Sequence, residues 1–222
     1  MTAGTTKPAL TDSRISLAAD EFVWSNPELS GAHSYLSAPT IRILKSFRAR
    51  KVLDLGCGNG AFAALLAANN FLVSGCDGSG SGIRLARTAF PNIAFFQHDL
   101  SKALPPWHAG LYDAVVSLEV IEHLFFPRLL PARAFQELRP GGLFIVTTPF
   151  HGYWKNLALA ITNKFDEHWH PLRDFGHIKF FSKRTLLSLL RESGFKVVDF
   201  LKAGRFPLLP CSMIVAATKP ER

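Results

Sequence analysis

Short apolar segments alternate with longer segments of helical character through most of the chain. Residues 52–55, 112–118 and 143–148 are almost continuously apolar, which is typical of parallel strands buried on both faces. Between such segments, residues 61–69 and 79–90 have the composition of helices. Strands that alternate with helices indicate βαβ units. The pattern therefore predicts an α/β domain with a mostly parallel sheet of seven strands and helices on both faces.

The predicted elements cover most of the chain after a polar N-terminal tail, residues 1–20. A helical segment, 27–49, is expected in two pieces broken at Gly31 and Pro39, and a turn is expected at 140–142. The strands are predicted at 52–55, 71–76, 93–97, 112–118, 143–148, 195–201 and 211–218, and the later helices at 61–69, 79–90, 127–138 and 182–193, the last of them capped by Gly194.

The regular alternation ends after Pro149. Residues 150–180 are rich in aromatic residues and histidine and have no clear period. The segment is too long for an ordinary connection, so we interpret it as an active-site lid. We accordingly divide the chain into an N-terminal tail with cap helices, 1–49, and a main domain, 50–222, with the lid inserted at 150–180.

Composition limits the class of protein. Hydrophobic residues make up 48% of the 222 residues and charged residues 19%, which indicates one globular domain. The three cysteines are widely spaced and form no C-x-x-C motif, so neither a disulfide framework nor a cysteine zinc site is expected. No secretory signal and no apolar run of membrane-spanning length is seen in the sequence. We expect a cytoplasmic protein.

The chain carries a formal net charge of +8. Such a charge can serve nucleic acid, an anionic membrane surface or an anionic substrate. The basic residues are scattered, without a run of five, so nucleic acid is the less favoured partner, although it is not excluded. A small-molecule partner is favoured, and the sequence leaves the oligomeric state open.

A glycine-rich loop, residues 56–60, lies between the first predicted strand and the next helix. Its spacing is G-x-G-x-G and Asp54 precedes it, whereas a dinucleotide fingerprint would be G-x-G-x-x-G. The shorter spacing favours a compact ligand without a pyrophosphate. Asp77 ends the second predicted strand, where a carboxylate can accept two hydrogen bonds from a ribose diol.

Residues 52–60 resemble the first motif of class I S-adenosylmethionine-dependent methyltransferases. His98-Asp99-Leu100 matches the position that meets the adenine in that family, and residues 138–142 are similar to its late motif. The resemblance spans residues 50–148 and implies a Rossmann-like fold with S-adenosylmethionine as cofactor. The cofactor-binding residues implied in this way are Asp54, Gly56, Gly58, Gly60, Asp77, Gly78, Asp99, Leu100 and Leu118.

Acidic residues and a histidine follow the fourth predicted strand, at the edge of the sheet where substrates bind. If Glu119 opens a helical turn, Glu122 and His123 lie on roughly the same face. Such a group can bind Mg, Mn, Fe, Co or Zn with open positions for a substrate. The lid offers a further ligand from His151, His168, His170 or His177.

Two methyltransferase subfamilies pair a similar Glu-x-x-Glu-His run with a later histidine: ubiquinone-biosynthesis O-methyltransferases, acting on catechols, and small-RNA 3′-terminal 2′-O-methyltransferases. The resemblance implies that Glu119, Glu122, His123 and His177 bind a divalent metal, Mg or Mn, which orients two adjacent substrate oxygens and lowers the pKa of one. Glu119, His123 and His177 are the candidate catalytic residues. In the alternative without a metal, Glu122 and His123 are structural, and Glu119 or a lid histidine acts as a general base.

Three functions remain open at this point. The favoured one is O-methylation of a small catechol, quinone precursor or diol, and the competing enzyme is a terminal RNA 2′-O-methyltransferase. A regulatory protein that binds S-adenosylmethionine without turnover is the third, although Glu119, Glu122 and His123 at the substrate edge argue against it. Trp24 and Tyr35 could close the other side of the cofactor or only pack against the fold.

Overall fold

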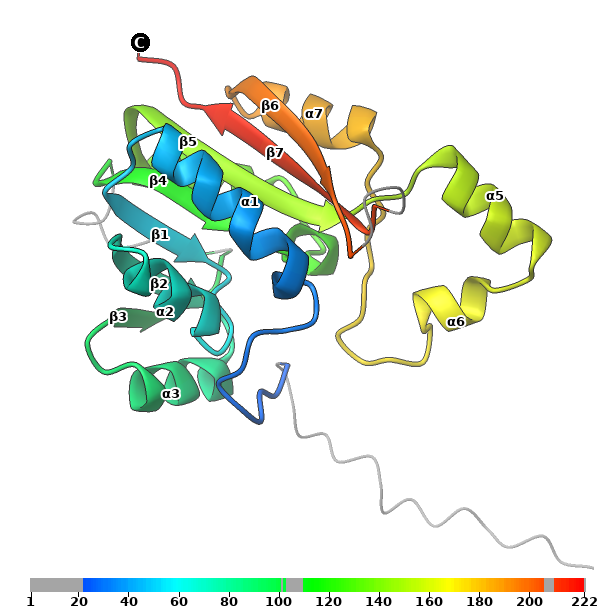
Figure 1. Cartoon of the computed structure of the whole chain (residues 1–222), viewed down its shortest axis with the longest axis horizontal. Coiled ribbons are helices and arrows are strands. Elements are labelled where there is room, and N and C mark those ends of the chain that lie inside the picture. Colours follow the sequence, from blue (N-terminus) through cyan, green and yellow to red (C-terminus); the bar gives the residue numbers. More distant parts are fainter. Residues whose placement is uncertain (1–21, 101, 103–109, 206–209, 222) are drawn as a thin grey trace, which may run out of the picture.

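A single seven-stranded sheet forms the centre of the molecule (Figure 1), a computed structural model that describes residues 22–100, 102, 110–205 and 210–221. The strand order is β3-β2-β1-β4-β5-β7-β6. The first five strands in this order are parallel, and β7 is antiparallel to both of its neighbours. The predicted α/β fold is confirmed. The strands are β1 Lys51–Leu55, β2 Leu72–Asp77, β3 Ala94–Gln97, β4 Tyr112–Ser117, β5 Leu138–Pro149, β6 Lys196–Ala203 and β7 Ser212–Thr218.

Helices cover both faces of this sheet, as expected. On one face α1 and α2 pack against the strands, and on the other face α4 and α7 do so. α5 and α6 lie apart from these layers, beyond the end of β5 (Figure 1). The helices are α1 His33–Ser46, α2 Ala61–Ala68, α3 Gly80–Ala89, the short η2 Ile121–His123, α4 Leu129–Glu137, α5 Tyr153–Ile161, α6 Phe165–Trp169 and α7 Lys183–Glu192.

The apolar strands supply two cores at once because successive side chains point to opposite faces of a sheet. In β5, Phe144 packs in the cluster that includes Leu130 of α4 and Leu186 of α7. The next residue, Ile145, belongs to the cluster with Leu36 of α1 on the other face. All five side chains are fully buried, and each such burial stabilises the fold by about 1.5–3 kcal/mol. The sheet is therefore held rigidly from both sides.

The N-terminal segment differs from its prediction. Residues 27–32 are not helical, and α1 is one helix that continues through Pro39. Proline removes one backbone donor and usually kinks a helix. Here Leu36, Thr40 and Leu44 share one buried stripe, and the Thr40 hydroxyl donates to the carbonyl of Leu36. Packing on both sides of Pro39 outweighs the local preference. The predicted tail, 1–20, lies outside the described residues.

Two further predictions need correction. Residues 140–142 do not form a separate turn; they lie within β5, where Gly141 has φ 72° and the pairing with β4 shifts register. The lid is not irregular throughout, since it contains α5 and α6. By contrast, the capped helix near the C-terminus is confirmed: Ser182 forms a capping box with Thr185, and Gly194 follows the helix at φ 89°.

Among the described residues, no helix has both the length and the apolar composition needed to cross a membrane. The carboxyl ends of β1, β2 and β4 meet at one edge of the sheet because these strands are parallel. Since β7 runs in the opposite direction, its first residue, Ser212, lies at that same edge, paired with Pro149 at the end of β5. The candidate residues of the site therefore lie at the ends of these strands or in the segments that follow them.

Candidate cofactor and acceptor site

The glycine loop turns sharply at the end of β1. Gly56, Gly58 and Gly60 have φ values of 88°, 53° and 77°, a region that residues with a side chain rarely adopt. The N–H groups of Gly56 and Cys57 both donate to the carbonyl of Cys76, which ties the loop to β2. A β-carbon at Gly56 would collide with the side chain of Val120. The loop thus depends on glycine both for its conformation and for its close approach to the β4 end.

Asp77 holds this loop in place from the end of β2. One carboxylate oxygen accepts a hydrogen bond from the N–H of Gly58 at 2.8 Å, and the other accepts from the N–H of Ser79 at 2.7 Å. An ionised carboxylate has about four acceptor positions, so one carboxylate can accept both from backbone N–H groups and from the hydroxyls of a ribose. Asp77 can therefore shape the loop and bind a cofactor at the same time.

The other predicted cofactor residues lie in three different environments. Asp54 is buried at the end of β1, where burial and the nearby Asp77 raise its pKa to about 8. Gly78 is exposed, and the nearest atom to a β-carbon placed there is the His98 carbonyl oxygen at 3.9 Å. A β-carbon at Gly78 would therefore make only an ordinary van der Waals contact. The remaining three are Asp99, which is exposed, Leu100, which is half-buried, and Leu118, which is buried in a core.

The segment 22–28 crosses over the glycine loop. The indole of Trp24 packs against Gly58 and Gly82 so closely that a β-carbon at either glycine would collide with it. The side-chain amide of Asn59 donates to the carbonyls of Asn26 and Glu28, each at 2.8 Å. The N-terminal segment is therefore fastened to the loop, and Trp24 packs against the fold, one of the two roles considered for it from the sequence.

A second group of side chains lies beyond the end of β4, in η2 and the lid. One ligand atom each from Glu122, His123 and His177 lies within 4.8 Å of the others. Nδ1 of His123 lies 2.9 Å from the carbonyl of Phe175 and 3.1 Å from that of Gly176. Because a carbonyl only accepts, Nδ1 must carry the proton, and Nε2 of a neutral His123 keeps its lone pair.

Glu122 is the buried member of this group. Its backbone carbonyl accepts from the N–H groups of Ile178 and Lys179, which fastens the lid to η2. Neither carboxylate oxygen has a hydrogen-bond partner among the described residues. Burial and the nearby Glu119 raise its pKa well above the ordinary value, although the adjacent Thr148 hydroxyl acts in the opposite direction. Such a group needs a proton or a cation.

His177 approaches Glu122 from the lid, with Nε2 and Oε1 at 4.0 Å. Burial, with the positive charge that His123 and Arg173 can carry, lowers the pKa of His177 to about 4. The pKa of His123 is also lowered, chiefly by burial. Both imidazoles are thus neutral at pH 7, the form that binds metals.

Glu119 lies outside this group, unlike the other three predicted ligands. Its φ of 55° turns the chain sharply at the end of β4, and its carboxylate accepts from the hydroxyls of Thr147, at 2.8 Å, and Ser212, at 3.2 Å. Burial raises the pKa of Glu119 to about 7. Thr147 and Ser212 were not predicted as site residues; their only signal in the sequence is their position at strand ends.

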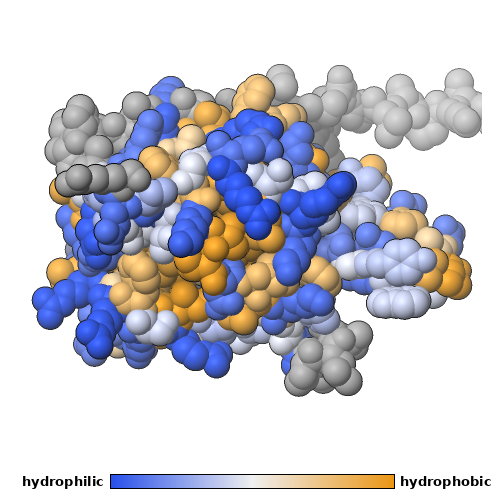
Figure 2. All heavy atoms as spheres, turned by 90° about the horizontal axis from the view of Figure 1, so that it is seen from above, coloured by the Kyte–Doolittle hydropathy of each residue, from blue (hydrophilic) through white to orange (hydrophobic). Residues whose placement is uncertain are grey.

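The lid surrounds this edge with aromatic side chains. His151 stacks on Trp169 with ring centres 4.8 Å apart, and Trp169 contacts Phe180 edge-on at 3.7 Å. The outer surface of the lid is mixed: Tyr153 and Trp154 are more than 70% exposed, and Figure 2 shows blue, pale and orange surface on this part at its right. The lid can therefore offer flat apolar walls to an acceptor.

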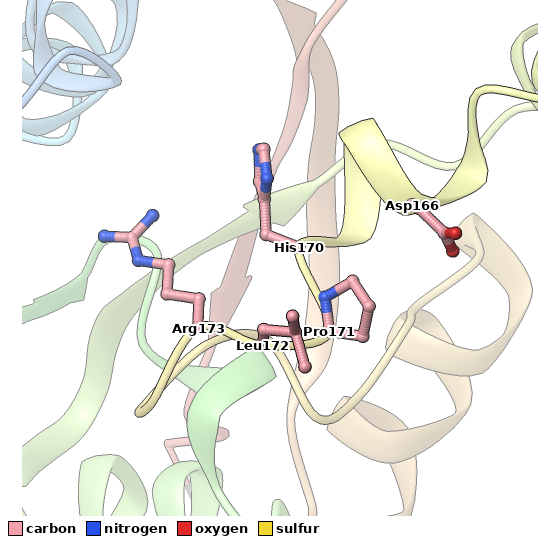
Figure 3. A pocket seen from close by; sticks show the side chains of 5 residues that line it. All are labelled: Asp166, His170, Pro171, Leu172 and Arg173. Atoms are coloured by element: carbon pink, nitrogen blue, oxygen red, sulfur yellow. The ribbon is translucent and has the colours of Figure 1, made fainter. Parts of the chain in front are cut away.

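A hollow of about 570 Å³ lies farther along the lid, around α6 (Figure 3). His170 and Arg173 point to the same side of it, whereas Asp166 points away from both. Apart from His170, which was one of four lid histidines considered, none of the predicted site residues lines this hollow. This hollow therefore lies away from the residues predicted at the strand ends.

The sequence profile of the methyltransferase domain family matches residues 29–199. This match covers most of the chain, and the chain belongs to that family. It is 33% identical over 152 residues to a protein of Mycolicibacterium smegmatis named as a probable S-adenosylmethionine-dependent methyltransferase, a match that covers 68% of this chain and 54% of that protein. The seven-stranded sheet is thus that of a methyltransferase domain.

Two further comparisons describe the range of relatives. A ubiquinone biosynthesis O-methyltransferase of Roseobacter denitrificans is 31% identical over 159 residues, which are 69% of this chain and 62% of that protein. The solved magnesium protoporphyrin IX methyltransferase of Synechocystis, with bound S-adenosylhomocysteine, has a TM-score of 0.63 at 18% identity and covers 82% of this chain and 81% of its own. The latter likeness concerns the fold. The chain spans only 54% and 62% of the lengths of these two curated relatives.

Proposed function

We propose that this protein transfers a methyl group from S-adenosylmethionine to an oxygen of a small molecule that carries two adjacent hydroxyls, such as a catechol. The observation that carries the proposal is the group Glu122, His123 and His177, within 4.8 Å of one another, with Glu119 near enough to raise the pKa of Glu122. Two adjacent hydroxyls can bind such a group together, and the aromatic lid suits a flat ring. The kinship with ubiquinone O-methyltransferases supports the same acceptor class.

Bound S-adenosylmethionine supplies an electrophilic methyl group on a positively charged sulfur. Asp77 and the glycine loop orient it from the β1 and β2 ends, and the lid excludes water from the acceptor side. Glu119 takes the proton of the attacking hydroxyl. Its pKa of about 7 suits a general base at neutral pH. The oxygen gains the methyl group, and the sulfur becomes neutral.

The proposal includes a divalent metal at Glu122, His123 and His177. The donors fit one, because both imidazoles are neutral and the buried carboxylate has no hydrogen-bond partner among the described residues. Two nitrogens and one oxygen favour Mn, Fe or Zn over Mg, which prefers oxygen. When bound, the metal would lower the pKa of an acceptor hydroxyl. Since Glu122 must lose its proton to bind, metal affinity should rise with pH.

Calorimetry followed by an acceptor screen tests the proposal. We would titrate the protein with S-adenosylhomocysteine and then with Mn²⁺ or Mg²⁺, and compare Glu122→Gln. Methyl transfer would be assayed by mass spectrometry with 3,4-dihydroxybenzoate, with 4-hydroxybenzoate as the acceptor lacking the second hydroxyl, with and without EDTA. Transfer confined to the catechol supports the proposal. Cofactor binding with no transfer to any diol would contradict it and favour a non-catalytic binder.

A terminal RNA 2′-O-methyltransferase is the second candidate, because the ribose at an RNA 3′ end also carries two adjacent hydroxyls. The net charge of +8 favours this reading. A short single-stranded RNA with a free 3′ end therefore belongs in the same screen, with the 2′-deoxy end as its control. Methylation of the RNA in preference to the catechol would replace the small-molecule proposal.

A further inference from the structure

Two hydroxyl groups connect the N-terminal helix to Glu119. The hydroxyl of Tyr35, on α1, lies 3.2 Å from Oγ of Ser212, the first residue of β7. Ser212 in turn donates to one carboxylate oxygen of Glu119 at 3.2 Å. The three groups are far apart in sequence, since Tyr35 and Ser212 are separated by 177 positions and Ser212 and Glu119 by 93. Only the complete fold brings them together.

The ionised carboxylate of Glu119 fixes the direction of these hydrogen bonds, because it can only accept. Ser212 must use its proton toward Glu119, so Tyr35 is the donor to Ser212. On the other side, Thr147 donates to the second oxygen at 2.8 Å and accepts from the Glu119 N–H at 3.0 Å. Both carboxylate oxygens are thus held, one directly from β5 and one through Ser212 from α1.

The surroundings make this arrangement rigid. Ser212 and Thr147 are fully buried, and the φ of 55° at Glu119 leaves its backbone little freedom. Tyr35 is half-buried and also lines a hollow of about 560 Å³ along α1 and β6. Of the three hydrogen-bonded residues, Tyr35 is therefore the one that reaches the surface. Through Ser212, the position of α1 affects the position of the Glu119 carboxylate.

We propose that Tyr35 and Ser212 are positioning residues that hold the carboxylate of Glu119 toward the acceptor. The proposal rests on the proposed function, because it is there that Glu119 receives the acceptor's proton. Neither residue touches the transferred methyl group in this proposal. They act through Glu119, as the supporting hydrogen bonds of a general base do.

Charged groups also act on the pKa values of Glu119 and of the residues around it. Lys155 of α5 lowers its pKa, whereas burial raises it, and Glu119 in turn raises the pKa of Glu122 in η2. Cys211 and Arg205 act on Tyr35 from the segment before β7. Because hydrogen bonds from Ser212 and Thr147 stabilise the ionised form, removing one should raise the pKa of Glu119 above about 7.

The first test needs no acceptor. With ¹³C-labelled glutamate, the carboxyl signal of Glu119, assigned by its absence in Glu119→Gln, would be titrated by NMR. We expect its pKa to rise by about one pH unit in Ser212→Ala and about half a unit in Tyr35→Phe, and to stay in place in Ser212→Thr. Tyr153→Phe, which removes an exposed hydroxyl from the lid, is the control. An unmoved signal in Ser212→Ala and Tyr35→Phe would overturn the proposal.

The second test uses transfer to 3,4-dihydroxybenzoate in a double-mutant cycle. We expect Tyr35→Phe to lower kcat about tenfold with little change in KM or in affinity for S-adenosylhomocysteine. In the Glu119→Gln background, the same substitution should have no further effect. A full tenfold loss in that background would show that Tyr35 acts elsewhere and overturn the proposal. Absence of transfer in the wild-type protein would contradict the proposed function, while the NMR titration still decides the positioning role.

Discussion

At the scale of single residues, two aspartates show how similar hydrogen bonding can serve different ends of the sheet. Asp77 accepts from two backbone N–H groups at the carboxyl edge, beside the glycine loop. Asp113 accepts from the N–H groups of Arg50 and Lys51 at the opposite edge, both at 2.9 Å. Only the first lies where a cofactor can reach it. Substituting each aspartate in turn therefore distinguishes the effect of losing backbone hydrogen bonds from the effect of losing a group that binds the cofactor.

We predict that Asp77→Asn raises the dissociation constant of S-adenosylhomocysteine about tenfold or more, because it removes a charged acceptor from both the loop and the ribose. Asp113→Asn should leave that constant within about twofold, since its partners are structural. Calorimetry measures both constants, and circular dichroism checks that both variants fold. Equal effects of the two substitutions would mean that Asp77 only supports the fold.

Asp54 should make stability depend on pH. Its ordinary pKa of 3.8 is raised to about 8 in the folded protein by burial and by Asp77. Between these values the folded state holds a proton that the unfolded state has lost, so the free energy of unfolding falls as pH rises from about 4 to 8. Below about pH 4 both states are protonated, and the contribution is fully retained.

Unfolding by urea at several pH values tests this prediction. We expect the wild-type protein to lose stability relative to Asp54→Asn as pH rises, while histidines with lowered pKa, such as His33 and His151, cancel because both proteins contain them. The exposed Asp174→Asn serves as the matched control. A constant difference between wild type and Asp54→Asn from pH 5 to 8 would disprove a buried, protonated Asp54.

The residues of the site were predictable only as far as their signals are local. Glycine spacing and an acid at a strand end are properties of a few neighbouring positions, so Gly56, Gly58 and Asp77 could be located in advance. The orientation of Glu119 depends on partners 28 and 93 positions away and on a positive φ that glutamate rarely adopts. The sequence therefore located Glu119 without indicating which way its side chain points.

At the scale of elements, local sequence predicts some helices, whereas tertiary packing decides others. The capping box and Gly194 delimit α7 by local chemistry, and that helix was predictable. Pro39 is a local signal that the packing of α1 overrides. α5 and α6 were not predicted from the aromatic and histidine-rich segment 150–180, and none of their residues is buried in the structure.

The lid helices should accordingly contribute little to stability. We predict that replacing residues 153–169 with a Gly-Ser linker changes the free energy of unfolding by less than about 1 kcal/mol and leaves affinity for S-adenosylhomocysteine within about threefold. Methyl transfer should be lost, because the walls of the acceptor site are removed. Urea unfolding, calorimetry and the catechol assay measure the three effects. A variant that no longer folds would show that α5 and α6 belong to the core.

At the scale of the whole molecule, the residues that stabilise the fold and the residues of the candidate site lie in different parts of the sheet. The two cores hold the sheet from both faces, while the glycine loop, Glu119 and the group of Glu122, His123 and His177 follow strand ends at one edge. Parallel strands make this separation necessary, because their carboxyl ends open on the same side. Loops at that edge can change the acceptor without disturbing the cores, which explains why relatives with one fold have different acceptors in their names.

Net charge is the remaining property of the whole molecule, and it distinguishes the two acceptor classes. A charge of +8 should attract a single-stranded RNA at low salt whatever its sequence, by release of counterions from the phosphates. We predict that the affinity for a fluorescent RNA, measured by anisotropy, falls about tenfold between 50 and 200 mM salt, and that a 2′-deoxy 3′ end binds as well as the natural end. Preference for the natural end that persists at 200 mM would mean that the site recognises the terminal diol, and the RNA acceptor would then replace the catechol.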